Sequence, residues 1–128
     1  MIQNGTYLNV QDNSGARLVQ CIKISKGYKS RYAYIGEVIL VSIKKLRTKR
    51  RLLSKVKKGE ISKALIVRTK TKFKLLNNGN SNAFLENSVV LLNKQNKLIG
   101  TRIFGLLPKK LRYTKFFRLI SLSSGVIS

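Results

Sequence analysis

A dense run of positive side chains is the first feature of this 128-residue chain that could do chemistry. Nine of the fifteen residues at positions 44–58 are lysine or arginine, and none of the fifteen is acidic. Like charges at this density repel one another until a polyanion neutralises them, which favours binding over a merely solvated loop. The whole chain carries 27 basic and 4 acidic residues, and its formal net charge of +23 favours the same kind of partner.

A second basic feature has the spacing of a strand. Every second residue from position 68 to position 74 is positive, namely Arg68, Lys70, Lys72 and Lys74. Alternate residues of a strand share a face and lie about 6.5–7 Å apart, so these side chains could follow the phosphates of an RNA backbone. The alternative is an edge strand whose lysines prevent aggregation. Contact with RNA is the stronger of the two interpretations.

Two further basic clusters lie at residues 26–34 and 100–118. In the first, tyrosines are interspersed with lysine and arginine, an arrangement that could stack on RNA bases but that half-buried strands also show. Because the four clusters are spread along the chain, the charge is expected to surround the domain. Such a distribution suits a protein embedded in folded RNA better than one that reads a linear duplex.

The residue types that most enzymes depend on are almost absent. There is no histidine, only one cysteine, and four acids that each lie more than twenty residues from the next. This composition leaves neither the usual catalytic triad nor the ligands of a structural zinc site. We therefore expect no catalytic residue, no metal, no cofactor and no small-molecule substrate.

Short strand-like segments fill most of the chain, at residues 6–10, 16–24, 38–41, 63–73 and 84–92. The run at 38–41 is apolar throughout, which is typical of a strand buried on both faces. The sequence Asp12-Asn13-Ser14-Gly15 predicts a turn between the first two strands, with Gly15 at positive φ or in close backbone contact. Short helices are expected only near the C-terminus, at residues 109–112 and 115–120. The pattern predicts one all-β domain over residues 1–128, a small barrel or sandwich with a C-terminal appendage.

Three signals bear on the environment of the chain. Cys21 lies in an apolar strand-like run and is predicted to be a small core residue. No apolar run approaches the roughly 18 residues of a membrane-spanning helix. The N-terminus lacks the charged-then-apolar form of a signal peptide. Neither membrane insertion nor export is expected.

Five blocks of sequence, collinear along the chain, resemble the ribosomal protein L fourteen family of the large ribosomal subunit. The first lies within residues 1–17 and includes Asp12-Asn13-Ser14-Gly15-Ala16-Arg17. The others lie within residues 31–37, 56–60 and 63–70 and at Gly100-Thr101-Arg102-Ile103-Phe104-Gly105. Together the blocks cover nearly the whole chain.

The resemblance implies a fold and a role. The fold is a small five-stranded β-barrel over about residues 1–98, with a basic β-ribbon or loop, followed by a C-terminal loop with short helices over about residues 99–128. The role is structural: the family binds large-subunit rRNA at the intersubunit face and contributes to a bridge with small-subunit rRNA during translation. Ribosomal proteins L three and L nineteen are the implied neighbours.

Charge and resemblance together predict which side chains meet these partners. The residues predicted to bind rRNA are Arg17, Lys45, Arg47, Lys49, Arg50, Arg51, Lys55, Lys57, Lys58, Arg68, Lys70, Lys72, Lys109, Lys110 and Arg112. Thr101, Arg102 and Arg118 are predicted to face the partner subunit.

The chain departs from the family pattern in three places. Residues 46–54 form a longer loop without the family's proline and glycine, residues 83–88 lack its usual charged residues, and the proline after the 100–105 block is displaced to Pro108. Charge repulsion should keep residues 46–58 extended or disordered until rRNA neutralises them. The amides from Arg47 to Lys55 should then exchange freely in the isolated protein.

The composition also suggests where such a ribosome works. The long basic loop and an abundance of Lys, Asn and Ile, whose codons are AT-rich, favour an organellar ribosome in the mitochondrial matrix. A plastid or a bacterial cytoplasm is the alternative location. Outside the ribosome, the charge would also suit a sequence-tolerant nucleic-acid-binding protein or a polybasic protein docked on an anionic membrane. The densest charge lies in strand and loop sequence rather than on an amphipathic helix, which disfavours the membrane.

Overall fold

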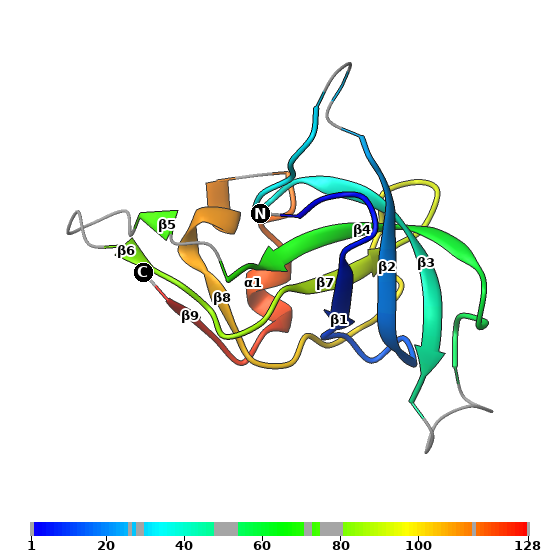
Figure 1. The fold of residues 1–128 in the computed structure, drawn as a ribbon. Helices are drawn as coiled ribbons and strands as arrows, with labels where there is room; N and C mark the ends of the chain where they lie inside the picture. The colour runs from blue at the N-terminus through cyan, green and yellow to red at the C-terminus, as the bar shows by residue number, and fades with distance from the viewer. Residues whose placement is uncertain are drawn as a thin grey trace.

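The computed structural model describes residues 2–25, 27, 30–47, 54–70, 73–74, 81–113 and 115–127, and its main feature is a closed barrel. The barrel strands are β1 (Tyr7–Val10), β2 (Ala16–Ile24), β3 (Val38–Leu46), β4 (Ile61–Arg68) and β7 (Ser88–Leu92). Neighbouring strands are antiparallel except β1 and β7, which pair in parallel and close the barrel (Figure 1). The predicted all-β, five-stranded barrel is confirmed.

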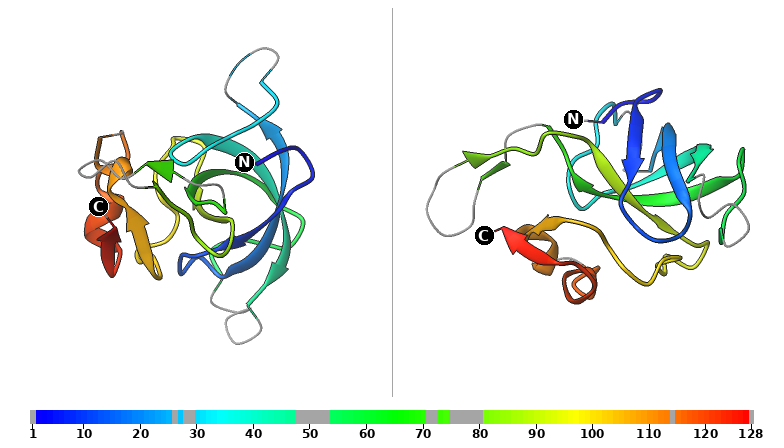
Figure 2. Two further views of the ribbon diagram at one scale, coloured as in Figure 1. Left: turned by 60° about the vertical axis from the view of Figure 1, so that its left-hand side comes forward. Right: turned by 90° about the horizontal axis from the view of Figure 1, so that it is seen from below.

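The remaining elements lie to one side of the barrel (Figures 1 and 2). β5 (Phe73–Lys74) and β6 (Ser81–Asn82) form a two-stranded antiparallel ribbon, and β8 (Leu106–Pro108) pairs in parallel with β9 (Gly125–Ile127). A 3₁₀ helix (Lys109–Tyr113) and a short α-helix, α1 (Leu119–Leu122), come between β8 and β9. The helix expected at 115–120 thus begins only at Leu119. Within the described part of the chain, no helix has the length and apolar character needed to cross a membrane.

Inward-facing aliphatic side chains fill the barrel. In β3, Ile39, Val41 and Ile43 are buried, and the residues between them are half-buried. This strand therefore buries one face fully, and the expectation of complete burial on both faces is wrong. Each fully buried aliphatic side chain stabilises the fold by about 1.5–3 kcal/mol. The same buried cluster includes Leu107 and Leu119, so the C-terminal appendage packs on the barrel.

Cys21 lies in β2 with its side chain in the core, as predicted. Burial raises the pKa of its thiol, and a backbone hydrogen bond at Lys23 partly opposes that effect. A buried thiol with a raised pKa is protonated at neutral pH, which makes it a poor nucleophile. Cys21 is thus a packing residue.

β4 ends earlier than the alternating charges predict. The pairing of β4 with β7 shifts register between Ile66 and Arg68, which marks a β-bulge at Val67. After Arg68 the chain leaves the barrel, and β5 belongs to a separate ribbon. A bulge changes the face to which later side chains point. The strand predicted over residues 63–73 is therefore wrong at Thr69 and Lys70, which follow the end of β4, whereas Phe73 lies in β5. The strand predicted from residue 84 begins at Ser88.

Candidate nucleic-acid interface

The turn at residues 12–15 reverses the chain between β1 and β2 and supports the candidate interface. Asp12 is only 1% exposed, and its carboxylate accepts hydrogen bonds from the Ser14 N–H at 3.1 Å and from the Leu91 N–H in β7 at 3.0 Å. Gly15 has a φ of +105°, and a Cβ there would lie 2.5 Å from the Ser54 Oγ. Positive φ and close contact at Gly15 are both confirmed, and together they explain why a side chain is excluded.

Asn13 joins this turn to a segment 88 residues later in the chain. Its Oδ1 accepts hydrogen bonds from the Thr101 N–H at 2.7 Å and the Arg102 N–H at 3.2 Å, and its Nδ2 donates to the Thr101 Oγ1 at 2.8 Å. A Cβ at Gly100 would lie 2.8 Å from the same Asn13 Oδ1, so only glycine fits at that position. The first and the last of the five blocks that carried the family resemblance therefore pack directly on each other.

The rest of the 100–105 segment is also tied to the barrel and the appendage. The Phe104 N–H donates to the Gln11 carbonyl at 2.8 Å, and the Ile103 N–H donates to the Leu122 carbonyl at 3.2 Å. Ile103 is itself buried. The segment thus presents exposed side chains from a backbone that is fixed on both sides.

Arg68, the last residue of β4, turns toward this segment. Its Nη2 donates to the Phe104 carbonyl at 2.8 Å, and a Cβ at Gly105 would lie 2.6 Å from its Nη1. Burial lowers the pKa of Arg68, while the negative charge of Glu86 acts in the opposite direction. The guanidinium keeps its charge at neutral pH in either case. Arg68 therefore anchors the 100–105 segment to β4, and its contact with rRNA stays a prediction.

Arg47, which follows β3, is a second arginine in contact with Phe104. Its Nη2 donates to the Val10 carbonyl at 3.0 Å, and its guanidinium carbon lies 5.5 Å from the centre of the Phe104 ring. A cation over an aromatic ring at this distance stabilises the contact by about 0.5–2 kcal/mol. Both half-buried arginines of the predicted RNA-binding set thus hold the protein's own segments together.

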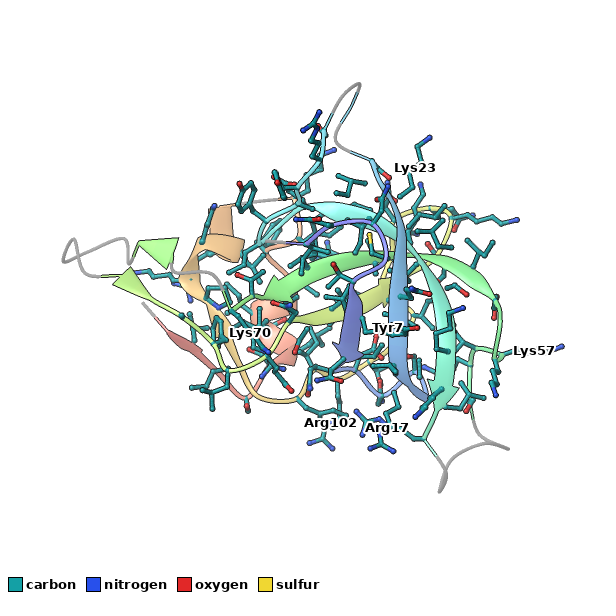
Figure 3. All side chains as sticks on the ribbon, viewed as in Figure 1. Tyr7, Arg17, Lys23, Lys57, Lys70 and Arg102 are labelled. Carbon is teal, nitrogen blue, oxygen red and sulfur yellow. The ribbon has the colours of Figure 1, made fainter. Side chains whose placement is uncertain are left out.

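The other described basic residues of the predicted set lie mostly on the surface. Arg17, Lys45, Lys55, Lys57, Lys58, Lys70, Lys110 and Arg112 are exposed, and Lys109 is half-buried. Lys55 also donates from its Nζ to the Ile99 carbonyl at 3.2 Å. These residues are spread over the molecule rather than gathered in one patch. Figure 3 shows Lys57, Lys70 and Arg17 well apart from one another. Lys49, Arg50, Arg51 and Lys72 lie outside the described residues.

Thr101, Arg102 and Arg118, which were predicted to face the partner subunit, are all exposed. Figure 3 shows Arg102 and Arg17 on the same lower edge, with both side chains pointing away from the barrel. The hydrogen bonds of Asn13 connect these two positions, because Arg17 follows the same turn that carries Asn13. A charged edge with a fixed backbone is therefore available to a phosphate-bearing partner.

All four acidic side chains accept hydrogen bonds from the protein's own strands, loops and turns. Asp12 does so in the turn described above, Glu37 accepts from the Tyr34 N–H at 3.2 Å, and Glu60 accepts from the Lys57 N–H at 3.0 Å. Glu86 accepts from Asn9 at 2.8 Å and from Gln11 at 2.9 Å. The few negative charges thus serve local folding, which leaves a strongly positive exterior.

The ends of the long basic loop are fixed in the folded protein. The Arg47 N–H donates to the Gly15 carbonyl at 2.8 Å, and the Lys55 N–H donates to the Ser14 carbonyl at 2.9 Å. The prediction that amides from Arg47 to Lys55 exchange freely is therefore wrong at these two ends, because hydrogen-bonded amides exchange slowly. Residues 48–53 lie outside the described part of the chain.

Sequence reasoning missed the part played by Asn13. It assigned Asn13 to a turn and Thr101 to a partner-facing block, but it did not predict that the two residues are in contact. Their appearance in two separate family-like blocks was the available signal. Phe104 was likewise unassigned, although its ring and its carbonyl are the points on which Arg47 and Arg68 converge.

Comparison with known proteins decides the family. The chain matches the family described as ribosomal protein L14p/L23e over residues 1–127. It is also similar to the large ribosomal subunit protein uL14 of Carsonella ruddii (strain PV), with 46% identity over 127 residues, which cover 99% of this chain and 100% of the relative. The chain belongs to the ribosomal protein L14p/L23e family.

Membership of the L14p/L23e family establishes the general role. The chain is a structural constituent of the large ribosomal subunit and is not an enzyme. Its location is accordingly the ribosome. The relative is bacterial, so it lends no support to a mitochondrial location, which stays a prediction.

Proposed function

We propose that this L14p/L23e protein binds large-subunit rRNA through its exposed cations and presents Thr101 and Arg102 to small-subunit rRNA, as part of an intersubunit bridge. The observation that carries the proposal is the contrast between many exposed lysines and arginines and a few acids whose carboxylates accept hydrogen bonds from the protein itself. Such a surface attracts phosphates through charge and the release of condensed counterions. Ribosomal proteins L three and L nineteen are the protein neighbours that the family resemblance implies.

The exposed cations and the half-buried arginines have different roles in this proposal. The exposed residues Arg17, Lys45, Lys55, Lys57, Lys58, Lys70, Lys110 and Arg112, together with Lys109, contact rRNA phosphates. Arg47 and Arg68 act mainly by holding Phe104, and through it the 100–105 segment. Lys49, Arg50, Arg51 and Lys72 join the phosphate-binding group on the basis of their charge alone. Arg118 joins Thr101 and Arg102 on the side of the partner subunit.

Sedimentation tests the assignment to the ribosome. In a sucrose gradient at low magnesium, where the subunits separate, the protein should travel with the large subunit and be absent from the small one. A sequence-tolerant nucleic-acid-binding protein outside the ribosome would instead stay near the top of the gradient or follow other nucleic acid.

Salt titration tests the assignment of the phosphate contacts. Replacing Lys45, Lys57 and Lys58 with glutamine should lower the salt slope of binding to a large-subunit rRNA transcript by about two to three units. The matched control replaces Lys23, Lys94 and Lys97, which are also exposed and which the proposal does not use. Equal losses in the two triple variants would show that charge acts diffusely and that the chosen residues are not special.

The type of ribosome is a finer part of the proposal. The similarity to a bacterial protein over the full length of both chains supports a bacterial-type ribosome. Fractionation of the source cells tests the location: peptides from the protein in ribosomes of isolated mitochondria would support a mitochondrial matrix, and peptides in ribosomes of a bacterial cytoplasm would overturn it.

A further inference from the structure

We propose that Asn13 is a positioning residue that sets the backbone of Thr101 and Arg102 before the partner RNA arrives. This inference rests on the proposed contact between these two residues and small-subunit rRNA. It adds to that proposal a residue that touches no partner itself. It is supported by hydrogen bonds between residues that lie 88 and 89 positions apart in the sequence.

The Asn13 side chain uses both of its polar atoms to hold Thr101, and its oxygen also holds Arg102. Oδ1 accepts from the Thr101 N–H at 2.7 Å and from the Arg102 N–H at 3.2 Å, while Nδ2 donates to the Thr101 Oγ1 at 2.8 Å. The opposite orientation of the amide would place its NH₂ against two N–H donors, so the contacts themselves fix the orientation. Two consecutive backbone amides are thereby held by one side chain.

Asn13 is itself held by the barrel. Its neighbour Asp12 is buried and accepts a hydrogen bond from the Leu91 N–H in β7 at 3.0 Å. On the other side, Ser14 is buried and its carbonyl accepts from the Lys55 N–H at 2.9 Å. The backbone of Arg102 is thus held in place relative to β7 through the hydrogen bonds of Asp12 and Asn13.

The residues that flank Thr101 and Arg102 are fixed by other groups. The Ile99 N–H donates to the Leu91 carbonyl at 3.2 Å, and the Phe104 N–H donates to the Gln11 carbonyl at 2.8 Å. Loss of the Asn13 side chain should therefore release two residues and leave the rest of the segment in place. A positioned backbone raises affinity because the ordering entropy has already been lost before binding.

Hydrogen exchange of the isolated protein tests the local effect. In Asn13→Ala, the Thr101 and Arg102 amides should exchange at least tenfold faster, while the Leu91 and Phe104 amides stay protected. Asn13→Asp keeps the oxygen acceptors and should restore most of the protection. Uniformly faster exchange, or failure of Asn13→Ala to fold, would show that Asn13 supports the fold as a whole and would overturn the proposal.

Subunit association tests the functional effect. Large subunits reconstituted with each variant are mixed with small subunits, and association is followed by light scattering. Arg102→Gln should lower the association constant about tenfold, as expected for one lost charge-assisted contact. Asn13→Ala should lower it about threefold to tenfold in the otherwise unchanged protein and less than twofold in a background that carries both Thr101→Ala and Arg102→Gln, because Asn13 acts through these two residues.

The outcomes separate this inference from the function on which it rests. If Arg102→Gln weakens association but Asn13→Ala does not, or if Asn13→Ala acts equally in both backgrounds, the positioning role is overturned and the bridge stands. If the double variant Thr101→Ala with Arg102→Gln leaves association unchanged, the bridge contact of these two residues is overturned, and the role of Asn13 with it.

Discussion

The basic segment at residues 44–58 and the 100–105 segment, both proposed to meet RNA, are built in opposite ways. The basic segment carries nine positive side chains, and those described at Lys45, Lys57 and Lys58 are exposed. The 100–105 segment carries a single charge, on Arg102, but its backbone is held by several hydrogen bonds. Its N–H groups donate to the Asn13 side chain and the Gln11 carbonyl, and its Phe104 carbonyl accepts from Arg68.

The comparison shows that the number of charges and the precision of their placement are separate properties of a binding surface. Charges on exposed, flexible lysines add up through counterion release, which depends on salt and hardly on exact position. A charge on a fixed backbone contributes less to the total, but it contributes at a defined place, which is what a contact between two large particles requires. We therefore expect variants of the basic segment to change the salt dependence of binding, and variants around the 100–105 segment to change stability and the geometry of contact.

The largest effect should come from the anchor of the turn. Asp12→Ala removes the buried acceptor of the Ser14 and Leu91 N–H groups. Two buried donors without partners should lower the free energy of unfolding by about 3 kcal/mol, measured by urea denaturation. Lys57→Ala, at an exposed position of the basic segment, should change it by no more than about 0.5 kcal/mol. Equal effects would mean that the turn is not anchored on the barrel, and the comparison would fail.

Alanine substitutions at two glycines can distinguish the cost of backbone strain from the cost of a steric clash. Gly15 and Gly59 both have positive φ, at +105° and +83°, but a Cβ at Gly15 would lie 2.5 Å from the Ser54 Oγ, whereas one at Gly59 would meet nothing within 4 Å. Gly59→Ala should cost about 1 kcal/mol for strain alone, and Gly15→Ala about 2 kcal/mol, because it adds the contact with Ser54. Thermal unfolding of both variants measures the difference. Equal losses would show that the chain at Ser54 moves aside freely.

Substitutions of Arg68 and of Lys70 should have different effects, although both residues belong to the same row of alternating charges. Arg68→Gln loses the bond to the Phe104 carbonyl and should lower the free energy of unfolding by about 1 kcal/mol. Lys70→Gln should leave stability unchanged and lower the salt slope of RNA binding by about one unit. If both variants change only the salt slope, Arg68 faces phosphate after all, as the alternation in the sequence suggests.

The smallest effect should come from the Thr101 hydroxyl. Thr101→Ala removes the acceptor of the Asn13 Nδ2 but keeps the hydrogen bond from its own N–H to the Asn13 Oδ1. The stability change should be about 0.5 kcal/mol, and the Thr101 amide should remain protected from exchange. A loss as large as that of Asp12→Ala would mean that the hydroxyl, rather than the backbone, holds the segment.

Much of the fold could be predicted because it depends on local patterns. The strand-like character of β2, the turn at Gly15 and the burial of Cys21 all follow from near neighbours in the sequence. The family resemblance supplied the closure of the barrel, which local patterns left open between a barrel and a sandwich. The end of β4 was missed because a bulge at Val67 leaves no clear mark in the sequence and changes the face on which Arg68 lies.

The candidate site was harder to predict because its contacts are long-range. Exposed lysines could be named from charge alone, since solvation keeps them on the surface. Arginine is less predictable, because its planar group also binds carbonyls and aromatic rings, as Arg47 does with Val10 and Phe104. The bond between Asn13 and Thr101 spans 88 residues and depends on the whole barrel being closed.

RNA–protein cross-linking followed by mass spectrometry tests the division of labour between the two segments most directly. Peptides that contain Lys57 and Lys58 should cross-link to large-subunit rRNA both in isolated large subunits and in whole ribosomes. The peptide that contains Thr101 and Arg102 should cross-link only in whole ribosomes, and then to small-subunit rRNA. Cross-links from Arg102 to large-subunit rRNA in isolated subunits would contradict a surface held ready for the partner subunit.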